Sequence, residues 1–140
     1  MDGIVAVRAP AWFWIVVGVA LLWNLLGVTA YLAEAFGMAQ SEAHRALVDV
    51  RPAWATAAYA VAVFGGSLGC IALLARRRAA FPLLAVSFAA LLVQQAWNLA
   101  GPDAAIGVEG PALGFAVIVV LVSLGLVLLS RAAIRKGWVR

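Results

Sequence analysis

The hydrophobic residues of this chain fall into four long stretches separated by charged residues. About 20 apolar residues are enough for a helix to cross the hydrocarbon core of a bilayer. No charged residue occurs between Arg8 and Glu34, Arg51 and Arg76, Arg78 and Asp103, or Glu109 and Arg131. The pattern therefore predicts four transmembrane helices, at about 10–33, 52–75, 81–100 and 111–130.

Prolines support these bounds, because proline suits the first turn of a helix, where its missing N–H is not needed. Pro10, Pro52, Pro82 and Pro111 begin the four stretches. The fifth, Pro102, is predicted to end the third helix and begin a turn. The first stretch is too long for the apolar region of a secretory signal peptide, so we expect it to remain in the mature protein.

The composition defines the class of protein. Hydrophobic residues make up 66% of the chain and charged residues 11%, whereas about a quarter of the residues of a soluble domain are charged. We therefore predict an all-α membrane protein, a single four-transmembrane-helix bundle over residues 1–140, with the lipid bilayer as its main partner.

The positive charges predict the orientation of the bundle, because short cytoplasmic flanks are enriched in Lys and Arg. Of the 10 basic residues, only Arg45 and Arg51 lie in the predicted outer loop, residues 34–51. The others are Arg8, Arg76, Arg77, Arg78, Arg131, Arg135, Lys136 and Arg140. We predict cytoplasmic termini, with a basic tail at 131–140.

No separate basic domain exists, so no nucleic-acid partner is predicted.

Two features are predicted at the membrane surfaces. Trp12, Trp14, Trp54 and Trp138 lie near predicted helix ends and suit an interfacial belt, where the indole ring is buried and its N–H stays among headgroups. In the outer loop, Ser41 could cap a short helix that places Leu47 and Val48 toward the bilayer. A plain connector remains the alternative for this loop.

Two segments echo each other along the chain. Trp23-Asn24-Leu25-Leu26-Gly27 in the first helix resembles Trp97-Asn98-Leu99-Ala100-Gly101 in the third, and Ser-Leu-Gly recurs at 67–69 and 123–125. The echo suggests two parallel helix-hairpin repeats related by an axis along the membrane normal, as in some transporters. Chance matches in a chain rich in Ala, Leu, Val and Gly are the alternative.

The polar residues inside the spans are the candidate functional residues. Asn24, Tyr31 and Glu34 share one face of the first helix, and Gln94, Gln95 and Asn98 lie within one turn of the third. Carboxamides are not expected to face lipid, where their donors and acceptors would lack partners. These faces should therefore turn toward the bundle interior or toward another subunit.

Two interpretations of these residues remain open. They could form hydrogen bonds between helices, worth about 0.6 kcal/mol on average and up to about 1.7 kcal/mol. They could instead line a site for a small hydroxylated solute, beside an aromatic ring. The predicted substrate-binding residues are Asn24, Tyr31, Gln94, Gln95, Asn98, Trp23 and Trp97.

Small residues predict close helix packing. Gly65 and Gly69 have the Gly-x-x-x-Gly spacing that lets two helices approach closely, and Gly27 lies on the polar face of the first helix. On the second helix, Tyr59 is expected to reach the layer of Asn24. The fourth helix is nearly free of polar side chains between Pro111 and Ser123, so it is expected to face lipid or a partner helix.

No sequence motif predicts catalysis. The chain has no phosphate-binding loop and no dinucleotide fingerprint. With one histidine, His44, and one cysteine, Cys70, it has no set of ligands for a zinc site or a bis-histidine haem. We predict no catalytic residue, no metal and no cofactor, and expect His44 to be a solvated loop residue. The acid–base groups Glu42, His44 and Asp49 lack an oriented nucleophile.

The chain resembles a family of short bacterial inner-membrane proteins with four predicted helices, commonly labelled "sugar transporter". The resemblance rests on APAWFWIVVGVALLWNLLGVTAYL, PAWATAAYAVAVFGGSLG and the basic RKGW near the end. It implies a multi-pass protein of the bacterial inner membrane, and no site residue is carried over from it. The chain lacks the Pro-Gln dipeptide of three-helix sugar half-transporters.

Two functions remain as hypotheses. The first is a carrier, or carrier subunit, for a small uncharged polar solute such as a sugar. Because a lone four-helix unit is expected to offer little cavity, this hypothesis predicts a homo-oligomer, packed through Gly65 and Gly69 or through the fourth helix. The second is a non-transporting accessory or scaffold subunit of a larger membrane complex, suggested by the absence of charge within the spans.

Overall fold

The computed structural model describes residues 7–38, 41–101 and 110–140. These residues form α1 (Ala11–Ala35), α2 (Glu42–Val50), α3 (Ala53–Leu74), α4 (Ala80–Ala100) and α6 (Gly110–Arg135). All except α2 are long and apolar enough to cross a membrane. The predicted all-α, four-helix bundle of a multi-pass membrane protein is confirmed. The turn predicted at Pro102 lies outside the described residues.

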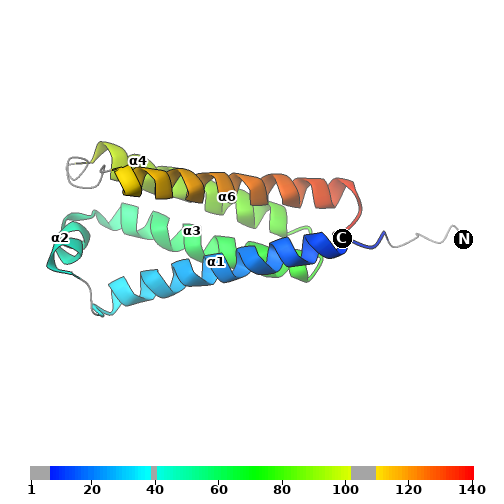
Figure 1. The fold of residues 1–140 in the computed structure, drawn as a ribbon, viewed down its shortest axis with the longest axis horizontal. Helices are drawn as coiled ribbons and strands as arrows, with labels where there is room; N and C mark the ends of the chain where they lie inside the picture. The colour runs from blue at the N-terminus through cyan, green and yellow to red at the C-terminus, as the bar shows by residue number, and fades with distance from the viewer. Residues whose placement is uncertain (1–6, 39–40, 102–109) are drawn as a thin grey trace, which may run out of the picture.

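The four long helices pack in chain order. α1 packs on α3, α3 on α4, and α4 on α6. α1 and α6 come closest where the chain ends and diverge toward α2 (Figure 1). We call the end that carries α2 the α2 end, and the opposite end, where Arg76–Arg78 join α3 to α4, the arginine end.

The helix starts follow the prolines. Pro10 and Pro52 stand directly before α1 and α3, Pro82 lies in the first turn of α4, and Pro111 is the second residue of α6. The short helix α2 is also present, and Ser41 Oγ accepts a hydrogen bond from the His44 backbone N–H over 3.3 Å. The capped helix, and not the plain connector, is therefore correct for the loop between α1 and α3.

Three helices end at a residue with positive φ, as in the common C-terminal motif that returns a backbone N–H to the last turn. These residues are Gly37 (φ 64°), Arg76 (φ 57°) and Gly137 (φ 71°). Glycine adopts this conformation without a steric cost, whereas at Arg76 it costs roughly 1 kcal/mol. Because nothing breaks the helix before Gly137, α6 continues to Arg135, and the predicted tail 131–140 begins as helix.

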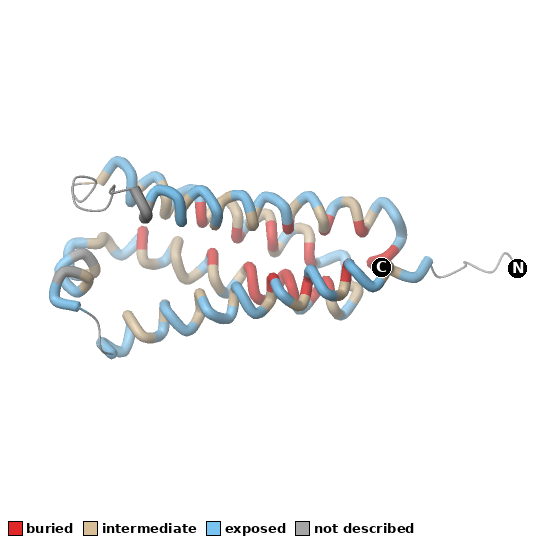
Figure 2. The backbone as a smooth tube through the Cα atoms, in the orientation of Figure 1, coloured by how far each residue is buried: buried red, intermediate tan, exposed pale blue. Residues whose placement is uncertain are grey.

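The core is concentrated at the arginine end of the bundle. Figure 2 shows most of the buried positions in the half of the bundle away from α2. Its most buried members include Phe13, Val17, Cys70, Leu73, Leu84 and Val139. The bundle is therefore tightly packed at one end and more open at the other.

Trp138 belongs to this core. The positive φ of Gly137 folds the chain back, so that Trp138 is only 7% exposed. Its ring lies edge-on to Trp12 and Phe13, with centroids 5.7 and 5.4 Å away. The prediction of an interfacial belt position was wrong for Trp138, while Trp12 and Trp54 are about half exposed.

The predicted packing glycines lie at contacts within the chain. A Cβ at Gly69 would come within 2.5 Å of Leu84 Cγ, and one at Gly65 within 3.1 Å of Ser87 Cβ, both on α4. A Cβ at Gly27 would lie 3.1 Å from Val63 Cγ1 on α3. Since α4 of the same chain occupies the face of Gly65 and Gly69, the predicted dimer contact through these two residues is wrong.

The two hairpins differ in how they meet. α1–α3 and α4–α6 follow each other in the order that a parallel repeat requires. A two-fold axis would give α6 and α1 the same contact that α3 and α4 have, but α1 and α6 do not pack along each other. The duplication remains a prediction that rests on the Trp-Asn echo.

Candidate functional site

A cavity of about 650 Å³ lies between the helices in the half of the bundle near α2. Its volume is within the range of about 300–1,000 Å³ that is usual for small-molecule sites. Every helix of the described chain contributes to it. The polar lining residues are Asn24, Glu34, His44, Arg51, Tyr59, Ser87, Gln94, Gln95, Asn98 and Ser123. Three further aromatic side chains line the cavity: Trp23, Trp97 and Phe115.

All the predicted binding residues except Tyr31 line this cavity. Tyr31 packs instead against Tyr59 and Phe64, with ring centroids 5.3 and 5.8 Å away and near-perpendicular planes. Tyr59 thus takes the cavity position that the sequence assigned to Tyr31. The prediction for Tyr31 as a binding residue has no support from its position.

The carboxamides of α4 face the cavity and do not bridge helices. Asn98 Nδ2 donates to Gln95 Oε1 over 3.1 Å, within the same helix. Gln94, one turn from Asn98, lines the cavity as well. An uncharged amide offers two donors and one oxygen acceptor, so this one bond uses only part of their capacity. Their other donors and acceptors form no further side-chain hydrogen bond within the described residues.

Asn24 has a mainly structural environment. Its Nδ2 donates to the Ala20 carbonyl over 2.8 Å and lies 3.8 Å from Cys70 Sγ on α3. Its Oδ1 lies so close to Gly66 that a Cβ there would overlap it. Of the two interpretations left open, helix-to-helix contact therefore fits Asn24, whereas exposure to a ligand fits Gln94, Gln95 and Asn98.

The floor of the cavity is tied by a hydrogen bond between helices. Ser87 on α4 donates from its Oγ to the Ala62 carbonyl on α3 over 2.6 Å. Both residues are buried. Below this level the close-packed core of the arginine end begins, so the cavity ends near Ser87.

A charged cluster borders the cavity at the α2 end. Glu34 Oε2 accepts a hydrogen bond from Arg51 Nη1 over 2.8 Å, and both side chains are only 12% exposed. His44 Nε2 lies 2.9 Å from Glu34 Oε1. The cluster ties the end of α1 to α2 and to the start of α3. The side chain of His44 is 41% exposed, so it is solvated as expected, but it belongs to α2 and not to an irregular loop, and it also contacts Glu34.

Aromatic rings form two walls of the cavity. Trp23 on α1 lies 5.9 Å from Phe115 on α6, and this is a contact between the two diverging helices. Trp97 on α4 meets Trp54 edge-on at 5.4 Å. The Arg51 guanidinium lies 5.8 Å from the ring centre of Tyr59. Apolar ring faces and uncharged amides thus surround the same space.

Sequence reasoning missed two parts of the lining. Glu34, Arg51 and Tyr59 were not among the predicted binding residues, although Glu34 was placed on the face of Asn24 and Tyr59 was expected to reach the layer of Asn24. α6 packs on α4, in agreement with the expected contact with lipid or a partner helix, and its residues Ala116, Val119 and Ser123 also line the cavity, which the sequence did not predict. The available signal was Ser123, the first of the two serines in this apolar helix, the other being Ser130.

Within the described residues, no group of three or more metal-ligating side chains gathers. No family model matches the chain, and no curated protein or solved structure matches it.

Proposed function

We propose that this protein binds a small uncharged polar solute, such as a sugar, in the cavity near the α2 end, as a carrier or as a subunit of one. The observation that carries the proposal is the position of the α4 carboxamides. Gln94, Gln95 and Asn98 line a cavity of about 650 Å³ instead of bonding another helix, and amides held in a membrane helix need partners.

The lining suits an uncharged, hydroxyl-bearing ligand. Amide groups both donate and accept hydrogen bonds, as hydroxyl groups do. Trp23 and Trp97 line the same cavity and provide ring faces for the apolar C–H surface of such a ligand. Among the lining residues that the structure describes, Glu34 and Arg51 carry opposite charges and neutralise each other in an ion pair. The resemblance to proteins labelled sugar transporters suggests the same class of ligand.

A single chain offers enough space for this site. The expectation that a lone four-helix unit has little cavity is contradicted by the volume observed, so the proposal no longer requires a dimer. Because the core at the arginine end is closed, a carrier function requires a second state in which this core opens. By the distribution of basic residues, the α2 end faces outward and the arginine end faces the cytoplasm.

The test is a titration of the protein in lipid nanodiscs with a panel of sugars and polyols, followed by tryptophan fluorescence. Trp23 and Trp97 line the cavity, so a bound solute should produce a saturable change. Gln94→Leu and Asn98→Leu should abolish it. Thr29→Val is the matched control, because Thr29 is exposed and bonds only its own helix, through the Leu25 carbonyl.

The titration has two possible outcomes. A saturable change lost in the α4 variants but kept in Thr29→Val would support the solute site and justify uptake assays. No change at solute concentrations on the order of 10 mM, where binding is worth only about 3 kcal/mol, would contradict it. That second outcome would favour an accessory or scaffold subunit.

A further inference from the structure

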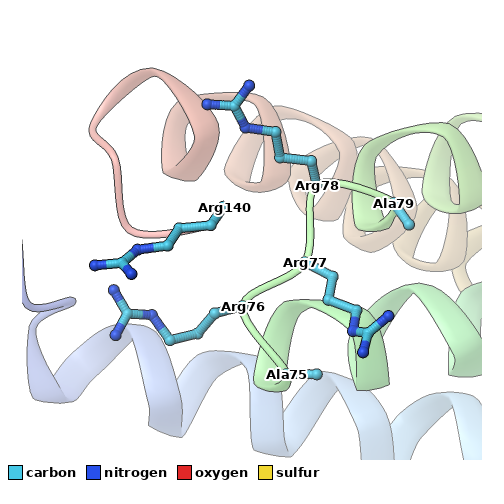
Figure 3. A pocket seen from close by; sticks show the side chains of 6 residues that line it. All are labelled: Ala75, Arg76, Arg77, Arg78, Ala79 and Arg140. Atoms are coloured by element: carbon cyan, nitrogen blue, oxygen red, sulfur yellow. The ribbon is translucent and has the colours of Figure 1, made fainter. Parts of the chain in front are cut away.

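The arginine end of the bundle carries a second pocket, on the opposite side of the molecule from the solute cavity. It is open and lined by Ala75, Arg76, Arg77, Arg78, Ala79 and Arg140 (Figure 3). Residues far apart in the chain form it, since Arg76–Arg78 join α3 to α4 and Arg140 follows α6. Within residues 7–38, 41–101 and 110–140, no carboxylate side chain lines this pocket.

Backbone hydrogen bonds hold the two segments together. The Arg140 N–H donates to the Arg76 carbonyl over 2.8 Å, and the Arg78 N–H donates to the Arg140 carbonyl over 2.9 Å. This pair of bonds fixes Arg140 beside Arg76. The buried side chains of Trp138 and Val139 anchor the same segment in the core.

The Arg76 side chain is itself held in place. Its Nε donates to the Trp138 carbonyl over 2.8 Å, and its Nη2 lies 3.3 Å from the Val7 carbonyl. These bonds connect the end of α3 to the segments before α1 and after α6. The guanidinium group is therefore positioned before any ligand arrives.

The arrangement places like charges together. In Figure 3 the guanidinium groups of Arg76 and Arg140 end next to each other at one side of the pocket, while Arg77 points away from them. Two like charges repel. The acidic residues of the described chain, Glu34, Glu42 and Asp49, belong to the end of α1 or to α2, at the other end of the bundle. An anion between the two groups would remove the repulsion.

The backbone of Arg76 adds an independent observation. Its φ of 57° is a conformation that glycine occupies in the two equivalent helix ends. A non-glycine residue held at positive φ is strained, and such strain concentrates at functional positions. An arginine stands where the backbone alone would favour glycine, which is consistent with a role for its guanidinium group.

We propose that Arg76 and Arg140 form a binding site for a phosphate group, carried either by the headgroup of an anionic lipid or by a soluble phosphate. The planar guanidinium fork matches phosphate oxygens and binds them through paired, charge-assisted hydrogen bonds. A basic pocket between transmembrane helices at the membrane surface is the usual setting for anionic headgroups. The site is independent of the solute cavity.

The experiment measures binding to the full-length protein in a neutral detergent. Phosphatidylglycerol, phosphatidylcholine and inorganic phosphate are added separately, with retained lipid measured by native mass spectrometry and the unfolding temperature by tryptophan fluorescence. The test variant is Arg140→Gln, because the contacts that Arg140 makes with Arg76 and Arg78 are backbone bonds. Arg131→Gln is the matched control, since it removes the same charge from an exposed position of α6 outside the pocket.

We expect wild type to retain phosphatidylglycerol in preference to phosphatidylcholine. Arg140→Gln should weaken this binding by about tenfold or more, the effect of losing one charged hydrogen-bond partner, and Arg131→Gln should not. Arg140→Lys, which keeps the charge, should recover part of it. Binding of inorganic phosphate with the same dependence on Arg140, without a preference for phosphatidylglycerol, would assign the site to a soluble phosphate.

Two results would overturn the proposal. One is the absence of any effect of phosphatidylglycerol or phosphate on wild type. The other is an equal loss in Arg140→Gln and Arg131→Gln, which would show attraction to general surface charge. Because affinities are compared within each variant by titration, a small change in the stability of Arg140→Gln leaves the comparison valid.

Discussion

Arg51 donates a hydrogen bond from Nη1 to Oε2 of Glu34 over 2.8 Å, joining residues 17 apart in the chain. The pair connects the end of α1 to the start of α3 at the border of the solute cavity. Both side chains are largely shielded, at 12% exposure. Surface ion pairs contribute little, but a shielded one leaves an unpaired charge when one partner is removed.

Glu34→Gln should therefore destabilise the bundle. The change leaves Arg51 without its countercharge and weakens the contact with His44, so we expect a loss of about 1–3 kcal/mol in the free energy of unfolding. Chemical unfolding in mixed micelles measures this. The control is Glu42→Gln, the same substitution at an exposed position of α2, with an expected loss under about 1 kcal/mol. If the free energy of unfolding falls equally in Glu34→Gln and Glu42→Gln, the ion pair contributes no more to stability than an exposed carboxylate.

Gly69→Ala should disturb the contact between α3 and α4. The new Cβ would lie 2.5 Å from Leu84 Cγ, an overlap that requires the Leu84 side chain or the helices to shift, and overpacking of this kind costs about 1–3 kcal/mol. Gly125→Ala on α6 is the matched control, because no atom lies within 4 Å of its new Cβ. Thermal unfolding of both variants should show a loss only for Gly69→Ala. If Gly69→Ala unfolds at the same temperature as the wild-type protein, the contact between α3 and α4 at this position is loose.

Ser87→Ala should weaken the same pair of helices through a hydrogen bond. Ser87 bonds across to the Ala62 carbonyl over 2.6 Å, and such bonds in membranes contribute about 0.6 kcal/mol on average and up to about 1.7 kcal/mol. Ser67→Ala is the control, since Ser67 is equally buried, at 6% exposure, but bonds Val63 of its own helix. Chemical unfolding should show the larger loss for Ser87→Ala, and the reverse order would contradict the assignment.

Trp138→Ala should open the arginine end. Trp138 packs on Phe13 and Trp12, and truncating a buried aromatic residue costs about 3 kcal/mol or more. Trp54→Ala removes an equally large ring that is 52% exposed, and should cost much less. The unfolding temperatures of the two variants provide the comparison. A tolerated Trp138→Ala would return Trp138 to the interfacial role expected from the sequence.

Several residues of the site could be predicted from the sequence, because the lipid environment constrains each helix separately. Gln94, Gln95 and Asn98 stood out because a membrane helix cannot leave carboxamides in lipid, and the structure places them at the cavity. Tyr31 does not line the cavity, because its ring packs against Tyr59, and its helical face alone did not predict this contact. The fold-back at Gly137 was missed because one glycine near the end of a chain has many uses.

The sequence by itself determined the four membrane-spanning helices and their approximate ends, because the requirement for about 20 apolar residues and for internally bonded backbone acts on each segment separately. It also determined which polar residues must avoid lipid. The tertiary structure alone decided that α1 and α6 diverge, that Glu34 meets Arg51, and that Arg140 lies beside Arg76. Helices that are apolar on every side have little preference for a neighbour in lipid, so small residues and matching side-chain shapes select the partners.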